Sequence, residues 1–213
     1  MAGPVIFTLG WLILGFLSPG YTLWGVRIAP YSPVSQAISG LGLGPTAPYM
    51  NTIFVLSGTL MLVGVAGILG SLGTMLSPRG RHTVLVLLGL PALGVMMDGV
   101  FTLRSSHLHY LGFSVALTCI AGYPACGLLL RRVTGWRRIG SWLIAGGPLT
   151  LAFTVLFFAT FSPTAKGAET GIAGLTERLL VIELMAWYAV LGWHAFAARI
   201  LGPARQSAWG RIR

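Results

Sequence analysis

The sequence predicts an all-α, polytopic membrane protein: one bundle of six transmembrane helices. Of its 213 residues, 55% are hydrophobic and only 8% are charged, whereas a water-soluble domain carries about 25% charged residues. Its mean hydropathy is +0.82. Six apolar segments are also long enough to cross a hydrocarbon core of roughly 30 Å. Together these observations exclude a soluble enzyme, a disordered chain and a nucleic-acid-binding domain, despite a formal net charge of +10.

The predicted spans cover residues 5–26, 52–76, 83–103, 110–130, 139–161 and 179–201. The first lacks preceding positive charges and a small-residue cleavage pattern, so we expect a retained span rather than a secretory signal. Pro19 and Gly20 lie inside this span and are expected to kink it. Small residues on spans two and four predict close helix contacts: Gly64, Gly67, Gly70, Gly73, Gly112 and Ala116.

The distribution of positive charges predicts the orientation in the cell membrane. Three segments on one side of the six-span arrangement carry only positive charges: Arg79, Arg81, Arg131, Arg132, Arg137, Arg138 and, in the basic tail of residues 202–213, Arg205, Arg211 and Arg213. The opposite side carries fewer positive charges, diluted by acids: Arg27, Arg104, Lys166 and Arg178 with Glu169 and Glu177. Both termini are therefore expected in the cytoplasm, with the odd-numbered loops outside.

The first outer loop, residues 27–51, is long for a small bundle. Ser32 followed by Pro33 is typical of a helix start, and Gly40 of a helix stop. We therefore expect a short amphipathic helix that presents Ser35 and Ser39 on one face and lies across the outer mouth as a lid. Both serines are expected to serve as caps and lid contacts rather than nucleophiles, because no base is adjacent in sequence.

Ionisable residues at membrane depth are candidate functional residues. Asp98 lies about 22 Å along span three, in the outer half, and Glu183 about 6 Å below the outer surface on span six. The two carboxyls are therefore predicted to share a depth. Glu183, Trp187, Val190 and His194 follow helical spacing on one stripe, which we expect to face the bundle interior.

Further polar residues gather at the outer ends of the spans. Arg104, His107 and His109 lie between spans three and four, and Glu177 is expected to pair with Arg178 or Arg104. Burial beside Trp187 would favour the protonated form of Glu183 and make it a proton donor. A structural role for Asp98, as a carboxylate neutralised by Arg104 or Arg178, weighs equally with a catalytic one.

Three segments carry a resemblance to a known family: Tyr31 to Gly58 (YSPVSQAISGLGLGPTAPYMNTIFVLSG), His107 to Phe113 (HLHYLGF) and Gly174 to Trp193 (GLTERLLVIELMAWYAVLGW). They resemble the "domain of unknown function 998" family of six-span prokaryotic membrane proteins, and the likeness covers nearly the whole chain. The serine-rich loop followed by Asn51 and the Glu177–Arg178 pair are its most specific features. The resemblance implies the architecture and a bacterial source rather than an activity.

A distant likeness links such families to ceramidase-like membrane hydrolases, which use serine, aspartate and three histidines around zinc. His107, His109 and Asp98 are acceptable zinc ligands. A third histidine at that depth is missing, since His82 and His194 lie elsewhere. A zinc site is therefore disfavoured, and the sequence predicts no metal and no other cofactor.

The leading hypothesis is a membrane-embedded enzyme for a hydrophobic lipid or isoprenoid substrate, with Asp98 and Glu183 as acid and base in a pocket open to the outer leaflet. An isomerase or cyclase is slightly favoured over a hydrolase, because the metal ligand set is incomplete. The alternatives are a non-enzymatic lipid-binding or structural protein and, less favoured, a small transporter, since no inverted repeat occurs. Contact with membrane lipids is expected; the sequence specifies no oligomeric state.

Overall fold

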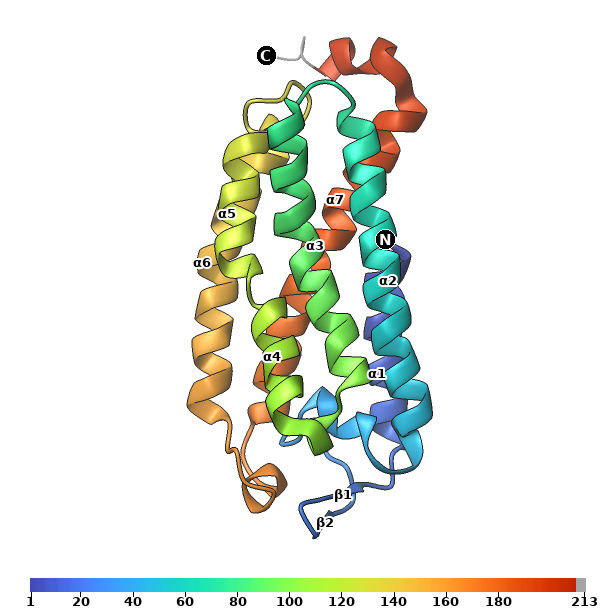
Figure 1. The fold of residues 1–213 in the computed structure, drawn as a ribbon, viewed down its shortest axis with the longest axis vertical. Helices are drawn as coiled ribbons and strands as arrows, with labels where there is room; N and C mark the ends of the chain where they lie inside the picture. The colour runs from blue at the N-terminus through green and yellow to red at the C-terminus, as the bar shows by residue number, and fades with distance from the viewer. Residues whose placement is uncertain (210–213) are drawn as a thin grey trace.

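In the computed structural model, seven α-helices within residues 1–209 form an elongated bundle with a small hairpin at one end (Figure 1). The structure describes the backbone of residues 1–209 and the side chains of residues 1–200. The predicted tail at 202–213 lies beyond the described side chains, and residues 210–213 lie outside the description altogether. The helices are α1 (Ala2–Leu17), α2 (Ala47–Leu72), α3 (Pro78–Val100), α4 (Ser106–Ala116), α5 (Cys119–Leu130), α6 (Arg137–Thr160) and α7 (Ala173–Trp209).

The helices pack as a ring in which chain neighbours are spatial neighbours. Helix α1 contacts α2, α2 contacts α3, α3 contacts α4 and α5, α5 contacts α6, α6 contacts α7, and α7 returns to α1 and α2. Large apolar side chains such as Leu9, Val63 and Phe158 are exposed on the outside of this ring. In the part of the chain that the structure describes, five helical segments are long and apolar enough to span a bilayer. The chain is therefore a multi-pass membrane protein whose outer surface contacts lipid.

The prediction for the first span is wrong at its C-terminal end. Helix α1 stops at Leu17 rather than continuing to Val26, because Ser18 precedes Pro19 and adopts an extended backbone with φ −74° and ψ 121°. Pro19 and Gly20 therefore end the helix instead of kinking it. Its 16 residues make α1 shorter than the five segments that are long enough to span a bilayer, and it begins about half-way along the long axis of the bundle (Figure 1).

A β-hairpin replaces the rest of that predicted span. Strand β1 (Tyr21–Leu23) pairs antiparallel with β2 (Val26–Ile28). The two residues between the strands, Trp24 and Gly25, both have positive φ, at 46° and 79°. That combination is the primed turn whose twist matches the twist of paired strands. The hairpin lies at the end of the bundle opposite the α2–α3 and α5–α6 loops (Figure 1).

The predicted lid is a buried plug rather than an amphipathic helix lying across the mouth. We call residues 31–46 the plug segment. Ser32 and Pro33 begin only a turn, and the helical residues come later, in two 3₁₀ helices, η1 (Ile38–Gly42) and η2 (Gly44–Thr46). Ile38, Leu41 and Leu43 are at most 2% exposed. The plug segment contacts α1, α2 and α7, and so closes this end of the bundle from inside.

The fourth predicted span is two helices. Helix α4 ends at Ala116 and α5 begins at Cys119. At the break the Val115 carbonyl accepts both the backbone N–H of Thr118 at 3.2 Å and the Thr118 hydroxyl at 2.7 Å. A side chain thus joins the backbone hydrogen bonds where the helix is interrupted. The break lets α4 pack on α3 while α5 packs mainly on α6.

Two small residues on α3 and α4 allow these helices to approach closely. A methyl group added at Gly94 would collide with the backbone of Gly112 and Ala116, and one added at Gly112 would collide with the Asp98 carboxylate. The expectation for α2 is wrong, because nothing lies within 4 Å of a methyl group added at any of its predicted contact glycines, Gly64, Gly67, Gly70 and Gly73. Those glycines face away from the neighbouring helices.

Candidate functional site

Buried polar side chains concentrate where the plug segment enters the bundle. Arg178 on α7 donates from Nη1 to the carbonyls of Pro33 (2.7 Å), Gln36 (3.0 Å) and Gly174 (2.8 Å), and from Nη2 to the Tyr31 hydroxyl at 2.6 Å. Its guanidinium also lies 5.2 Å from the centre of the Trp11 ring. Arg178 is 5% exposed. One buried cation therefore fixes the start of the plug segment to α7.

Tyr31 completes this anchor. Its hydroxyl donates to the Ala37 carbonyl at 3.0 Å while it accepts the Arg178 hydrogen bond. Burial raises the pKa of Tyr31 to about 12, against the opposing effect of the Arg178 guanidinium. The phenol therefore stays neutral and remains a hydrogen-bond donor over the whole physiological pH range.

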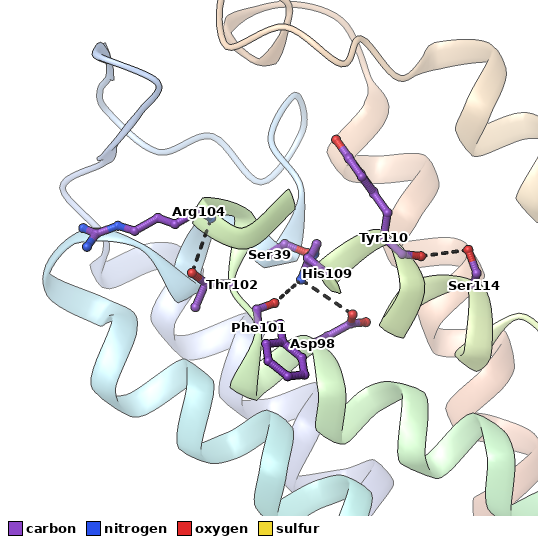
Figure 2. A network of polar contacts seen from close by, with 8 residues as sticks. All are labelled: Ser39, Asp98, Phe101, Thr102, Arg104, His109, Tyr110 and Ser114. Carbon is purple, nitrogen blue, oxygen red and sulfur yellow. Dashed lines mark hydrogen bonds and ion pairs between the residues drawn. The ribbon is translucent and has the colours of Figure 1, made fainter. Parts of the chain in front are cut away.

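Glu177 holds the next residues of the plug segment. Its Oε2 accepts the backbone N–H of Ile38 at 2.6 Å. The expected ion pair of Glu177 with Arg178 or Arg104 does not form among the described side chains: Arg178 binds carbonyls instead, and Arg104 is exposed. In Figure 2 the Arg104 side chain points away from His109. Glu177 thus positions the residue directly before Ser39.

Ser39, His109 and Asp98 meet at this end of the bundle, on η1, α4 and α3 (Figure 2). The Nε2 atom of His109 lies 2.9 Å from Ser39 Oγ, and its Nδ1 lies 2.8 Å from the Phe101 carbonyl oxygen and 3.6 Å from Asp98 Oδ1. His109 and Asp98 are buried, whereas Ser39 is half-buried. The sequence shows no base adjacent to Ser39, but the fold places His109 beside it.

The surroundings of His109 fix its tautomer. A carbonyl oxygen only accepts, so the contact with Phe101 requires a proton on Nδ1. In the neutral ring Nε2 is then an acceptor, and the Ser39 hydroxyl donates to it. Asp98 Oδ1 is buried beside Nδ1 without a hydrogen bond to any described residue. The three side chains are thus arranged in the order that nucleophilic catalysis requires: a hydroxyl nucleophile, a general base, and a carboxylate that stabilises the protonated base.

Two apolar cavities of about 40 Å³ each meet at Ser39, which lines both together with Phe113 and Glu177. The inner cavity lies among α1, α2, α3, α4 and α7 and includes Asp98 in its wall. The outer cavity includes His109 and an aromatic cluster on α4 and α6: Tyr110, Phe113, Phe157, Phe158 and Phe161. Phe158 and Tyr110 are 54% and 38% exposed, so the outer cavity reaches the lipid-facing surface.

Asp98 and Glu183 do not come together as predicted. Glu183 faces α6, where Oε2 accepts the Thr150 hydroxyl at 2.8 Å and Oε1 accepts Trp187 Nε1 at 2.5 Å. It lines neither cavity at Ser39. The predicted interior stripe is only partly interior, since Val190 is 38% exposed. His194 contacts the Gly135 carbonyl at 2.9 Å in the α5–α6 loop.

The remaining predicted residues lie around this site without joining it. His107 is exposed and His109 buried, because residues two apart on a helix face different directions. Ser35 is buried in the plug segment, and Asn51 donates to the Gly42 carbonyl at 3.3 Å. Within residues 1–200, no three His, Cys, Asp or Glu side chains lie close enough to hold a metal ion. His107 and His109 therefore offer no shared ligand set.

Sequence reasoning missed the Ser39–His109 contact, the Arg178–Tyr31 anchor and the Thr150 partner of Glu183. Ser39 and His109 are 70 residues apart, and no spacing connects them. The aromatic cluster had a visible signal in the Phe157, Phe158 and Phe161 run at the end of α6. In the sequence these aromatic residues resemble ordinary lipid-facing residues, because nothing there shows their contact with α4.

A family model described as "Protein of unknown function (DUF998)" matches residues 1–194. That range contains the plug segment and every residue of the site described above. Neither the curated proteins nor the solved structures contain a match to the chain.

Proposed function

The chain belongs to the DUF998 family, whose function is unknown, and we propose that it is a membrane-embedded serine hydrolase that cleaves an ester of a lipid or isoprenoid alcohol. The observation that carries this proposal is the 2.9 Å contact between Ser39 Oγ and His109 Nε2 where two apolar cavities meet. A serine hydroxyl becomes a useful nucleophile only when a positioned base removes its proton. The tautomer set by Phe101 makes His109 such a base.

The three residues have separate roles in this reaction. Ser39 Oγ attacks the ester carbonyl carbon, and its proton passes to His109 Nε2. The carbon–oxygen bond to the alcohol breaks, and His109 returns the proton to the leaving oxygen. Water then attacks the acyl-serine, His109 takes and returns one proton again, and the carboxylic acid leaves. Asp98, 3.6 Å from Nδ1, stabilises the imidazolium present between these transfers.

This proposal replaces the isomerase or cyclase with Asp98 and Glu183 as its acid–base pair. Both oxygens of Glu183 accept hydrogen bonds, from Thr150 and Trp187, and neither cavity at Ser39 reaches it. A proton donor for a hydrocarbon substrate must contact that substrate. We assign Glu183 a structural role, tying α6 to α7.

The aromatic wall of the outer cavity supports a substrate that comes from the membrane. The outer cavity is walled by aromatic rings, of which Phe113 lies edge-on to Phe157 at 5.8 Å between ring centres. Phe158 and Tyr110 are its exposed members, and they open the cavity at the outside of the helix ring. An apolar alcohol can therefore reach Ser39 from the membrane without crossing water.

We also propose the full membrane arrangement: the chain lies in the cell membrane, α1 is a sixth crossing, and both termini are on the cytoplasmic side. The α2–α3 and α5–α6 loops share one end of the bundle with the last part of α7 (Figure 1). That end carries arginines such as Arg81, Arg131 and Arg137, whereas the four acids lie elsewhere in the chain. Positive charge marks the cytoplasmic side, which assigns the Ser39 site to the outer leaflet.

A fluorophosphonate probe tests the proposed function, because an activated serine displaces its fluoride and becomes covalently labelled. We expect the detergent-purified protein to be labelled with one probe per chain. Ser39→Ala should abolish labelling, and His109→Gln should slow it by about 100-fold or more, the usual contribution of a general base. Labelling is measured by in-gel fluorescence and intact-protein mass.

Two matched variants control for folding. Ser114→Ala removes an exposed serine on α4, and His107→Gln removes the exposed histidine two residues from His109; both should label like the wild type. Wild-type protein that stays unlabelled while it melts cooperatively would contradict the proposal. The Ser39–His109 contact would then be a structural link between the plug segment and α4, in a non-enzymatic protein.

A further inference from the structure

We propose that the substrate carries a short acyl group, rather than a fatty chain, on the membrane-resident alcohol. This inference rests on the proposed function and adds the assignment of the two cavities to the two halves of the ester. It follows from the place of His109 and from the size of the inner cavity.

The position of His109 decides which half of the ester lies where. The leaving alcohol must receive its proton from Nε2, so it has to lie on the same side of Ser39 as the imidazole. His109 lines the outer cavity and is absent from the wall of the inner one. The alcohol therefore occupies the outer cavity, with its chain passing the aromatic cluster into the bilayer, and the acyl group enters the inner cavity.

The inner cavity limits the length of that acyl group. Its volume is about 40 Å³, a small fraction of the roughly 300–1,000 Å³ of pockets that hold a whole small-molecule ligand. It therefore favours a short acyl group over a fatty chain. Its far wall consists of Phe7, Phe54, Val95, Leu184 and Met185, each at most 5% exposed. A longer chain would have to displace closely packed side chains of four helices.

Ester hydrolysis with one leaving alcohol and two acyl lengths tests this assignment. The full-length protein in detergent is given 4-methylumbelliferyl acetate or octanoate, and kcat/KM is measured for each by fluorescence. We expect the octanoate value to be lower by about tenfold or more, the effect of a few methylenes that a pocket does not fit. Ser39→Ala should lose both activities.

Enlarging the inner cavity should reverse this preference. Met185→Ala on α7 and Val95→Ala on α3 widen it from different walls, and each should raise the octanoate-to-acetate ratio by about tenfold. Met75→Ala, an exposed methionine in the α2–α3 loop, serves as the control and should leave the ratio unchanged. The ratio compares two substrates of one sample, so a reduced folded fraction does not alter it.

The outcomes separate the two proposals. Equal kcat/KM for the two esters, or a ratio that neither enlarged variant changes, would overturn the acyl assignment while Ser39-dependent cleavage still stood. Failure to cleave either ester, together with no fluorophosphonate labelling of Ser39, would overturn the proposed function and this inference with it. Acetate preference that shifts toward octanoate in both enlarged variants would support the short acyl pocket.

Discussion

Arg178 and Glu177 hold the plug segment through backbone groups rather than through each other. The backbone of an irregular buried segment must find hydrogen-bond partners inside the protein. Arg178 supplies donors to the carbonyls of Pro33 and Gln36, and Glu177 accepts the N–H of Ile38. The two charged side chains thus supply the plug segment with hydrogen-bond partners, which the backbone of a helical span finds within its own helix. This is why both are buried although they do not form an ion pair.

Tyr31 makes the stability of this anchor depend on pH. A tyrosine titrates near pH 10.0 in the unfolded chain and near pH 12 in the folded protein, so the folded state binds more protons between these values. Stability is fully present below about pH 10 and is lost as pH rises toward 12. At about 1.4 kcal/mol per pKa unit, the free energy of unfolding should fall by roughly 2–3 kcal/mol.

The measurement compares the wild type with Tyr31→Phe in thermal melts between about pH 9 and pH 12. The variant lacks the Arg178 contact and should be less stable at pH 9, but its stability should fall less steeply with pH. Burial also raises the pKa of Tyr21, and the charge of Tyr31 adds to that shift, so the difference in slope reports Tyr31 together with its coupling to Tyr21. Parallel slopes would show that Tyr31 does not titrate differently in the folded state.

At the scale of the elements, α4 matters because it brings His109 against both α3 and the plug segment. The break after Ala116 frees α4 from the direction of α5, and Gly94 and Gly112 let it approach α3 closely. The same approach places the Asp98 carboxylate against Gly112. The candidate site therefore depends on how tightly two helices pack, as well as on which side chains they carry.

Gly112→Ala should separate these helices. The added methyl group collides with Asp98, so we expect a loss of about 1–3 kcal/mol in stability and slower fluorophosphonate labelling. Gly64→Ala is the matched control, since a methyl group there meets nothing within 4 Å. It should raise stability by up to about 1 kcal/mol through helix propensity. Thermal melts and labelling rates of the two variants provide the comparison, and equal behaviour would contradict the close α3–α4 contact.

At the scale of the whole molecule, the arginine-bearing loops and the candidate site lie at opposite ends of the bundle. The hairpin, plug segment and candidate site occupy one end, and the α2–α3 and α5–α6 loops occupy the other (Figure 1). The second end carries arginines in both loops without an acid. Such an arrangement favours one orientation in the membrane. Under the proposed function, that orientation would decide which leaflet supplies the substrate.

Cysteine labelling tests that orientation. We expect Trp24→Cys in the hairpin to react with a membrane-impermeant maleimide on intact cells, and Thr134→Cys in the α5–α6 loop to react only after permeabilisation. Both positions are exposed, whereas the native Cys119 and Cys126 are buried and should stay unlabelled. The opposite pattern would reverse the topology and move the site to the inner leaflet.

The sequence by itself determined the membrane class, the family likeness and the approximate position of five long apolar helices. These properties are local: apolar residues add up along about 20 positions, whatever surrounds them. It also identified Asp98 and His109 as candidates, because ionisable groups are rare in so apolar a chain. The same local reasoning failed at α1, where an extended Ser18 before Pro19 ended a segment that hydropathy alone would continue.

Only the tertiary structure decided which of the polar residues meet. Ser39 contacts His109, 70 residues away in the chain, because the plug segment folds into the bundle and the orientation of α4 places His109 inside and His107 outside. Glu183 shares a predicted depth with Asp98 but faces α6. Depth along a helix follows from counting residues, whereas the direction of a side chain across the bundle depends on helix rotation and on contacts with distant segments.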